Sequence, residues 1–196
     1  PTQQISLLKA LADGLSQRGL PLTAALRNSL TQKIKSVLEG GPGIEWYNAP
    51  LPDKQATPSP WGLEQRNYAD GDTTTMAISS VVEGGERLGG VLHSPMFTLP
   101  ERLTFWMCGH NGTPNDPDRH QNYARLVLEN GTEVARSYPP RDDKAQKTER
   151  NLSPWIGQRG HVEVVDGITA LDGFAWIAVS RFEPEVISVP SEPVGE

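Results

Sequence analysis

The feature that most constrains the fold of this chain is a series of short apolar runs separated by turn-forming residues. The runs lie at residues 75–82, 88–93, 103–108, 123–128, 132–137, 161–165 and 174–182. Runs of this length suit strands better than helices, and glycine, proline, asparagine and aspartate punctuate the intervals. Two packed sheets would bury such strands. We therefore predict a mainly β fold, an antiparallel β-sandwich.

The dipeptide Asn130-Gly131 is the strongest local signal in the series, because it lies between the alternating runs 123–128 and 132–137. A two-residue type I′ turn needs positive φ at both central residues, which asparagine and glycine tolerate. We predict an antiparallel hairpin with such a turn.

The pattern within the runs indicates which strands are central. Residues 103–108 and 174–179 are apolar on both faces, so we expect both strands to be covered on two sides. In the run from His161, Val162 and Val164 point to one face and His161 and Glu163 to the other. This alternation predicts a half-solvated strand.

The division of the chain follows from changes in pattern. Leucines at helical spacing predict two amphipathic helices within residues 1–42, the end of a preceding domain. Residues 43–60 are proline-rich and are expected to be a linker packed on the sandwich, which spans residues 61–184. Residues 185–196 are expected to be a flexible tail.

Composition excludes several classes of partner. The net charge is −6 and the pI is near 5.3, so nucleic acid and anionic membrane surfaces are poor partners. No apolar run approaches the roughly 20 residues of a spanning helix. A single cysteine, Cys108, excludes an internal disulfide. We expect the chain to be a segment of a longer polypeptide.

The order of several short motifs resembles a known family. Ser94-Pro95-Met96-Phe97, the apolar strand ending at Gly109, the hairpin at Asn130-Gly131 and the strand 162–166 occur in the order seen in galactose-binding-like jelly rolls. The chain is similar to the non-catalytic module of fructan-cleaving glycoside hydrolases. With residues 109–112, 139–143 and 174–176 included, it resembles more closely an uncharacterised domain of large secreted bacterial proteins that carry c-type haem (c-type-cytochrome proteins).

The loop 110–122 is the densest collection of polar side chains, and it joins two predicted strands. Asn, Asp, His and Arg can match the vicinal hydroxyls of a sugar, while the alternative is a solvated loop whose polar groups cap their own turns. Loop tryptophans can stack on sugar rings, and Trp61 and Trp155 are open to that role whereas Trp106 and Trp176 are expected in the core. The candidate ligand-binding residues are His110, Asn111, Asn122, Arg125, Arg141, Asp142, Asp143 and Trp155.

Catalytic signatures are missing from the sequence, which contains no Gly-x-Ser-x-Gly, no His-Glu-x-x-His and no cysteine at a helix start. We therefore expect a protein that is not an enzyme. The resemblance implies a structural calcium ion, with Asp70, Asp72 and Glu183 as its candidate ligands.

The leading hypothesis is a non-catalytic carbohydrate-binding module of a larger secreted bacterial protein, extracellular or periplasmic, that binds a polysaccharide or oligosaccharide through inter-strand loops. The alternative is a structural or protein-interaction domain that packs on neighbouring domains of its parent chain. That alternative predicts a rim whose polar residues are all paired internally.

Overall fold

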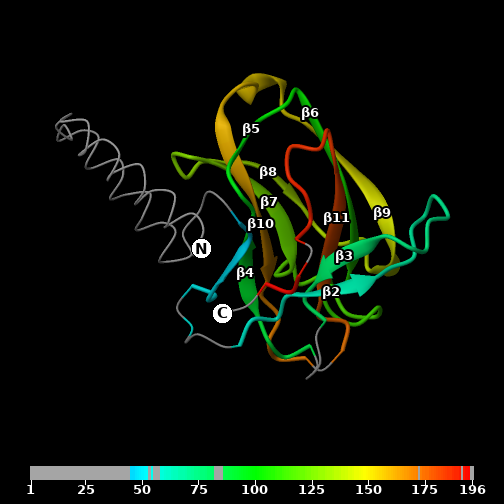
Figure 1. Cartoon of the computed structure of the whole chain (residues 1–196). Coiled ribbons are helices and arrows are strands. Elements are labelled where there is room, and N and C mark those ends of the chain that lie inside the picture. Colours follow the sequence, from blue (N-terminus) through cyan, green and yellow to red (C-terminus); the bar gives the residue numbers. More distant parts are fainter. Residues whose placement is uncertain are drawn as a thin grey trace, which may run out of the picture. The chain divides into compact units, whose positions relative to one another are not determined.

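The computed structural model describes residues 45–52, 54, 58–81, 86–171, 173–190 and 192–194. Two antiparallel sheets face each other in this part of the chain, and the predicted antiparallel β-sandwich is confirmed (Figure 1). The helices predicted within residues 1–42 lie outside the described residues.

Sheet one has the strand order β1-β4-β10-β7-β8, with β5 paired to β10. Its strands are β1 (Tyr47–Ala49), β4 (Gly90–His93), β5 (Phe97–Thr98), β7 (Tyr123–Leu128), β8 (Glu133–Ser137) and β10 (Arg159–Asp166). Strand β10 pairs with β4, β5 and β7 and is therefore the centre of this sheet.

Sheet two has the order β2-β3-β11-β6-β9. Its strands are β2 (Gly62–Gln65), β3 (Met76–Ser79), β6 (Arg102–Gly109), β9 (Asp142–Asn151) and β11 (Ile177–Glu183), and a short 3₁₀ helix, η1 (Ser153–Trp155), follows β9. As predicted from their apolar pattern, β6 and β11 lie inside the sheet, next to each other.

The main core lies between the sheets and is filled by alternate residues of each strand. Leu103, Phe105 and Met107 of β6 belong to it together with Ile177 and Val179 of β11. Their neighbours in sequence point to the other face of sheet two. The alternation predicted for β10 is also observed, because Val162 and Val164 lie in this core.

A second apolar cluster covers the outer face of sheet two. It contains Trp106, Cys108, Trp176 and Ala178, and Tyr68 from the β2–β3 connection completes it. The Tyr68 ring contacts Trp106 edge-on with centroids 5.6 Å apart, and its hydroxyl lies 2.8 Å from Ser180 Oγ. Both faces of β6 and β11 are thus covered, as their sequences predict.

Strand β9 was not predicted, because its sequence is almost entirely polar. Only Ala145 is buried among its ten residues. It is an edge strand, and charged side chains on an edge strand prevent pairing with another chain. Asp142 and Asp143, two of the candidate ligand-binding residues, begin this strand and do not lie in an inter-strand loop.

The hairpin at Asn130-Gly131 forms between β7 and β8, but its turn differs from the predicted one. Gly131 has φ +85°, whereas Asn130 is not among the residues with positive φ. Gly131 N donates to Leu128 O at 2.8 Å, and the register shifts between Leu126 and Val127. A longer loop that ends in a left-handed glycine satisfies the same strand twist.

The segment before residue 61 and the segment after Pro184 both contribute to the sandwich. Residues 47–49, within the expected linker, pair with β4 as β1, and Trp46 is buried beside Phe182. The expectation of a flexible tail does not account for Ile187 and Val194, which are buried in the main core. Burial of these aromatic and aliphatic side chains stabilises the packing of both ends of the domain on the sandwich.

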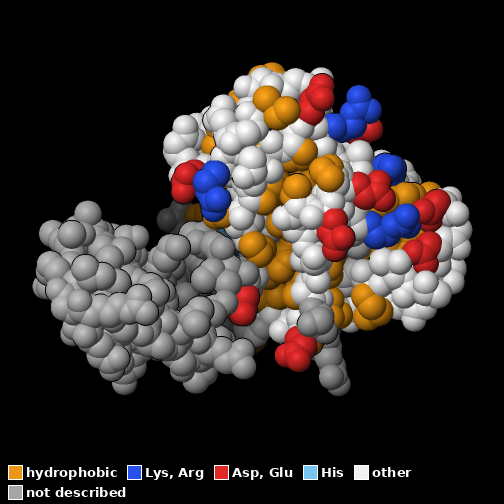
Figure 2. All heavy atoms as spheres, turned by 45° about the horizontal axis from the view of Figure 1, so that its top comes forward, with side chains coloured by type: hydrophobic (Ala, Val, Ile, Leu, Met, Phe, Trp, Pro, Cys, Tyr) orange, Lys and Arg blue, Asp and Glu red, His pale blue; other side chains and the backbone are white. Residues whose placement is uncertain are grey.

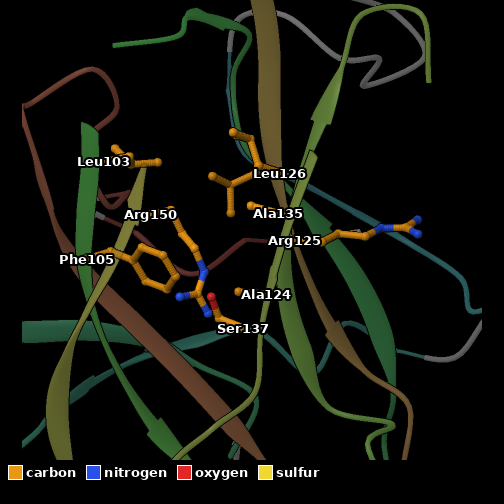
Figure 3. A pocket seen from close by; sticks show the side chains of 9 residues that line it. Leu103, Phe105, Ala124, Arg125, Leu126, Ala135, Ser137 and Arg150 are labelled. Carbon is orange, nitrogen blue, oxygen red and sulfur yellow. The ribbon is translucent and has the colours of Figure 1, made fainter. Parts of the chain in front are cut away.

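One side of the sandwich is closed by a charged side chain. Leu103, Phe105, Ala124, Leu126 and Ala135 line a narrow apolar cavity between the sheets. Figure 3 shows the Arg150 side chain entering this cavity, while the Arg125 side chain points away from it. Arg150 Nη2 donates to Arg136 O at 2.9 Å and so joins β9 to β8 across the gap.

Candidate functional site

Three connections converge at one end of the sandwich, which we call the loop end. They are residues 110–122 between β6 and β7, residues 138–141 between β8 and β9, and residues 167–171 with 173–176 between β10 and β11. Gly112 N donates to Phe174 O at 2.8 Å, and Gly167 N donates to Asn122 Oδ1 at 2.9 Å. The loop end contains four of the eight residues predicted to bind a ligand, and two more, Asp142 and Asp143, begin β9 beside it.

A glycine begins this region because no side chain fits there. Gly109 has φ +126°, and a Cβ atom on it would lie 2.3 Å from Trp176 O. The next residue continues the pairing, since His110 N donates to Trp176 O at 2.8 Å. The loop 110–122 is thereby fixed against the segment that precedes β11.

Asn111 and Asn122 are fully buried and hold the loop in shape. Asn111 Oδ1 accepts from Asn122 N at 2.6 Å, and its Nδ2 donates to Asn122 O at 2.9 Å. Asn122 Nδ2 donates to His110 O at 3.0 Å. Because their amide groups are engaged within the protein, these two residues shape the loop end rather than present groups to solvent.

His110 connects an exposed ring to an exposed carboxylate. Its own side chain is buried, and its Nε2 donates to Asp143 Oδ1 at 3.1 Å. The Phe174 ring meets the His110 ring edge-on, with centroids 5.0 Å apart. Phe174 is 43% exposed and the Asp143 side chain is 80% exposed. The loop end therefore presents an apolar ring and a carboxylate to solvent.

Phe174 was expected to begin a buried strand, and this prediction is wrong. Strand β11 begins three residues later, at Ile177. Phe174 has φ +58°, a left-handed conformation that is strained for an aromatic residue. An apolar ring beside Ala175 and Trp176 gave no sign in the sequence that it would be turned outward.

Left-handed backbone at non-glycine residues gathers at this end. His120 has φ +52° and Arg141 has φ +59°, in addition to Phe174. The Arg141 guanidinium donates to the Gly112 and Thr113 carbonyl oxygens. Strained residues of this kind are concentrated at functional sites in proteins. Each of the three connections contributes one of them.

The other predicted ligand-binding residues lie elsewhere or are tied locally. Asp142 Oδ1 accepts from Lys144 N at 2.9 Å at the start of β9. Arg125 lies on the outer face of sheet one, where its Nε donates to Glu163 Oε2 at 2.7 Å. Trp155 lies in η1, beyond the other end of β9, and packs against the main core.

The Trp61 indole is buried and offers no exposed face on which a sugar ring could stack. Trp61 is 2% exposed and its Nε1 donates to Asn48 Oδ1 at 3.0 Å. Trp106 and Trp176 are buried as predicted, in the cluster on the outer face of sheet two.

The predicted calcium ligands do not form one cluster. Asp70 Oδ2 accepts from Arg181 Nη1 at 2.8 Å, and Asp72 Oδ2 lies 3.7 Å from the same nitrogen. Hydrogen bonds from Thr75 and Thr74 hold the pKa of Asp72 below its usual range. Glu183 pairs instead with Lys147 at 3.2 Å. A guanidinium occupies the position beside these aspartates where a cation would bind.

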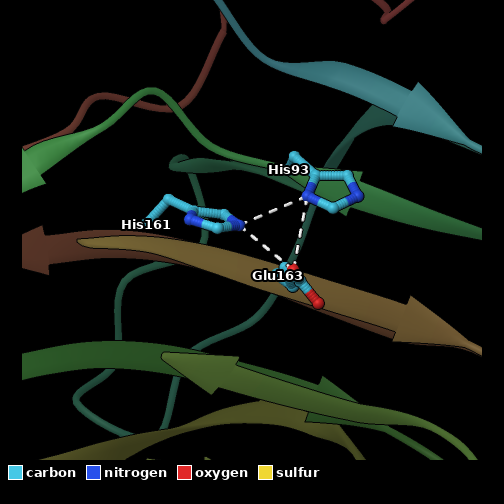
Figure 4. Close-up of side chains that lie close together, drawn as sticks. All are labelled: His93, His161 and Glu163. Carbon is cyan, nitrogen blue, oxygen red and sulfur yellow. Dashed lines mark hydrogen bonds and ion pairs between the residues drawn. The ribbon is translucent and has the colours of Figure 1, made fainter. Parts of the chain in front are cut away.

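Among the described residues, another group has the chemistry of a metal site. His93, His161 and Glu163 place one ligand atom each within 4.8 Å of the others (Figure 4). The sequence pattern predicted only that His161 and Glu163 share a face. Their side chains are 12% and 8% exposed, so the expectation that this face is solvated is wrong at these positions.

Charges of both signs are mixed on the surface shown in Figure 2. Acidic and basic side chains alternate there without a broad basic patch, which agrees with the net charge of −6. No helix within the described residues is long and apolar enough to cross a membrane.

Comparison with known proteins gives only distant likenesses. No protein-family model matches the chain, and no curated protein matches it in sequence. Among solved structures, the chain is similar to TmCBM61 in complex with β-1,4-galactotriose, with 16% identity over 74% of this chain and 90% of that one and a TM-score of 0.37. A family 35 carbohydrate binding module from an environmental isolate gives 12% identity over 75% of this chain and all of that one, with a TM-score of 0.32.

A third likeness is to the enzymatically active domain of tailspike protein 4 of bacteriophage CBA120, with 10% identity and a TM-score of 0.38. It covers 68% of this chain and only 18% of the chain of that domain. These likenesses are too distant to transfer a ligand or an activity. They give no support to the resemblance to c-type-cytochrome proteins.

Proposed function

We propose that this chain is a non-catalytic carbohydrate-binding module that holds a saccharide at the loop end. The observation that carries the proposal is the pairing of the exposed Phe174 ring with the exposed Asp143 carboxylate on either side of His110. An aromatic ring packs against the C–H face of a sugar, and a carboxylate accepts from its hydroxyls. The two contacts together recognise a polyol that also has an apolar face.

The rigidity of the loop end supports this proposal. The buried Asn111–Asn122 pair and the Arg141 contacts fix the loops before any ligand arrives. A preformed site loses less conformational entropy on binding than a mobile one. The residues assigned to ligand contact are Phe174, Asp143 and Arg141. His110 is assigned to the positioning of Asp143, and Asn111 and Asn122 are assigned to loop shape.

The test is calorimetric titration with a panel of plant and algal polysaccharides and their oligosaccharides. Phe174→Ala is expected to weaken binding by about tenfold, because an aromatic contact contributes about 0.5–1.5 kcal/mol beyond its buried area. Asp143→Asn keeps the shape of the side chain and removes its charge, so it is expected to reduce affinity with an unchanged fold.

Two exposed residues away from the loop end serve as matched controls. Met76 is 44% exposed on β3, and Glu129 is exposed in the β7–β8 hairpin. Met76→Ala and Glu129→Gln should therefore bind like the original chain. Asn122→Ala is unsuitable as a test, because it leaves buried groups unpaired and disturbs the loop itself. No saturable binding across the panel, or equal losses in the controls, would refute the proposal.

A second function is favoured by a different observation. Asn111, Asn122 and Arg125 are paired internally, as expected for a structural or protein-interaction domain that packs on its neighbours. If no saccharide of the panel binds and all variants are folded, the result favours this function. In either case we place the chain in a larger extracellular or periplasmic protein. The structural calcium ion that the resemblance implies stays a prediction.

A further inference from the structure

A row of aromatic and ionisable side chains crosses the outer face of sheet one. In the ladders, Tyr47 is opposite His93, His93 is opposite Glu163, and Glu163 is opposite Arg125. Residues directly opposite each other in antiparallel strands place their Cβ atoms about 4.5–5.5 Å apart. His161 joins the row from two positions along β10, on the same face as Glu163. The strand register alone therefore gathers two imidazoles and a carboxylate.

The three facing atoms form a nearly regular triangle. His93 Nδ1 lies 3.4 Å from His161 Nε2 and 3.5 Å from Glu163 Oε1, and His161 Nε2 lies 3.1 Å from Glu163 Oε1 (Figure 4). A tetrahedral Zn²⁺ with bonds of about 2.0–2.1 Å holds its nitrogen and oxygen ligands about 3.3–3.4 Å apart. The observed spacings match three corners of that tetrahedron.

We propose that His93 Nδ1, His161 Nε2 and Glu163 Oε1 bind a divalent transition-metal ion, with Zn²⁺ as the representative ion. Imidazole and carboxylate are ligands that zinc and its neighbours in the first transition series accept. No fourth histidine, cysteine or acidic side chain among the described residues joins the group. The fourth position of the ion is then available to water or to a ligand.

Hydrogen bonding explains this arrangement less well than a metal does. Both ring nitrogens face the same carboxylate oxygen, and two N–H groups directed at it would crowd each other at 3.4 Å. One cation bound between the three atoms would instead use the lone pair of each nitrogen and of the carboxylate oxygen.

Neighbouring side chains hold the ligands in position. Arg125 Nε and Nη2 bind Glu163 Oε2 at 2.7 and 2.6 Å, which leaves Oε1 facing the histidines. Glu133 Oε2 lies 3.3 Å from Arg125 Nη1 and offsets its charge. Tyr47 stacks on the His93 ring at 4.6 Å with a 6° tilt and fixes its orientation. Second-sphere partners of this kind orient metal ligands.

The experiment is a titration of the whole metal-free chain with Zn²⁺ alone, paired with Co²⁺ absorption spectra that report coordination geometry. We expect one ion per chain and the intense visible bands of four-coordinate Co²⁺. His161→Gln and Glu163→Gln should lose this binding. Arg125→Lys should weaken it by about 10–100-fold, the usual effect of removing a second-sphere partner.

His120→Gln is the matched control, because His120 is a histidine 58% exposed in the loop 110–122. It should bind Zn²⁺ like the original chain. If the original chain binds no stoichiometric ion, or if Co²⁺ gives only the weak spectrum of the hydrated ion, the proposal is wrong whether or not the variants fold. Equal loss in His120→Gln would also overturn it. The saccharide titration is independent of these outcomes, since it probes the loop end.

Discussion

Asp166 is a carboxylate enclosed in the protein at the end of β10, where it is 0% exposed. The Ser80 hydroxyl and the Ile168 N–H lie close enough to lower its pKa, but burial has the larger, opposite effect. Burial raises the pKa of Asp166 well above its usual range. The sequence Val165-Asp166-Gly167 resembles a surface turn, so only the tertiary structure reveals this burial.

Asp166→Asn is expected to stabilise the chain at pH 7. The unfolded chain ionises this carboxyl above a pH of about 3.9, whereas the folded chain keeps it protonated to a higher pH. Stability therefore falls as pH rises through the unfolded value, by about 1.4 kcal/mol for each unit by which folding raises the pKa. The variant has no such loss. Thermal melts should show a higher Tm for Asp166→Asn at pH 7 and convergence with the original chain near pH 3. An equal gap at both pH values would contradict this account.

At the scale of elements, apolar strands were predictable and polar ones were not. Strand β7 has the predicted bounds, Tyr123–Leu128, because apolar residues mark both of its ends. Strand β9 carries charges along its length, and its role as an edge is set by the partner β6. The connection 66–75 likewise gave no signal that Tyr68 would cover Trp106. These elements depend on contacts between distant segments.

Substitutions of Tyr68 measure how much the connection 66–75 contributes to stability. Its neighbour Ala69 donates its N–H to Ala145 O at 2.9 Å, and the Tyr68 ring is 1% exposed. Tyr68→Ala is expected to lower the free energy of unfolding by about 3–5 kcal/mol, as for other large aromatic truncations. Tyr68→Phe removes only the hydroxyl contacts with Ser180 Oγ and Thr75 O and should cost about 0.5–1.5 kcal/mol. Chemical denaturation measures both. Similar small losses would mean that the ring does not stabilise sheet two.

For the whole molecule, the stability of the sandwich depends on the core between its two sheets. Leu92 of β4 is fully buried there. Leu92→Ala should lower the free energy of unfolding by about 2–5 kcal/mol, because it leaves a cavity. Met76→Ala, at an exposed position, should change it by less than about 0.5 kcal/mol. Denaturant unfolding followed by tryptophan fluorescence compares them, and equal losses would count against a single core between the sheets.

The candidate ligand-binding site could be predicted only in part from the sequence. The loop 110–122 was identified correctly as a dense polar connection, but its residues divide into buried ones that shape the loop and exposed ones that face solvent. Asn111 and His110 are adjacent in sequence, yet one is locked to Asn122 and the other contacts Phe174. Which side chains turn outward depends on the packing of three connections that are far apart in sequence.

The sequence by itself determined the β class, the central strands and the hairpin at Asn130-Gly131, because period-two patterns and turn residues act over a few neighbouring positions. The tertiary structure decided the strand order, the burial of Asp166, the outward turn of Phe174 and the meeting of His93 with Glu163. Each of these depends on pairing between residues far apart along the chain, and local pattern does not encode such register.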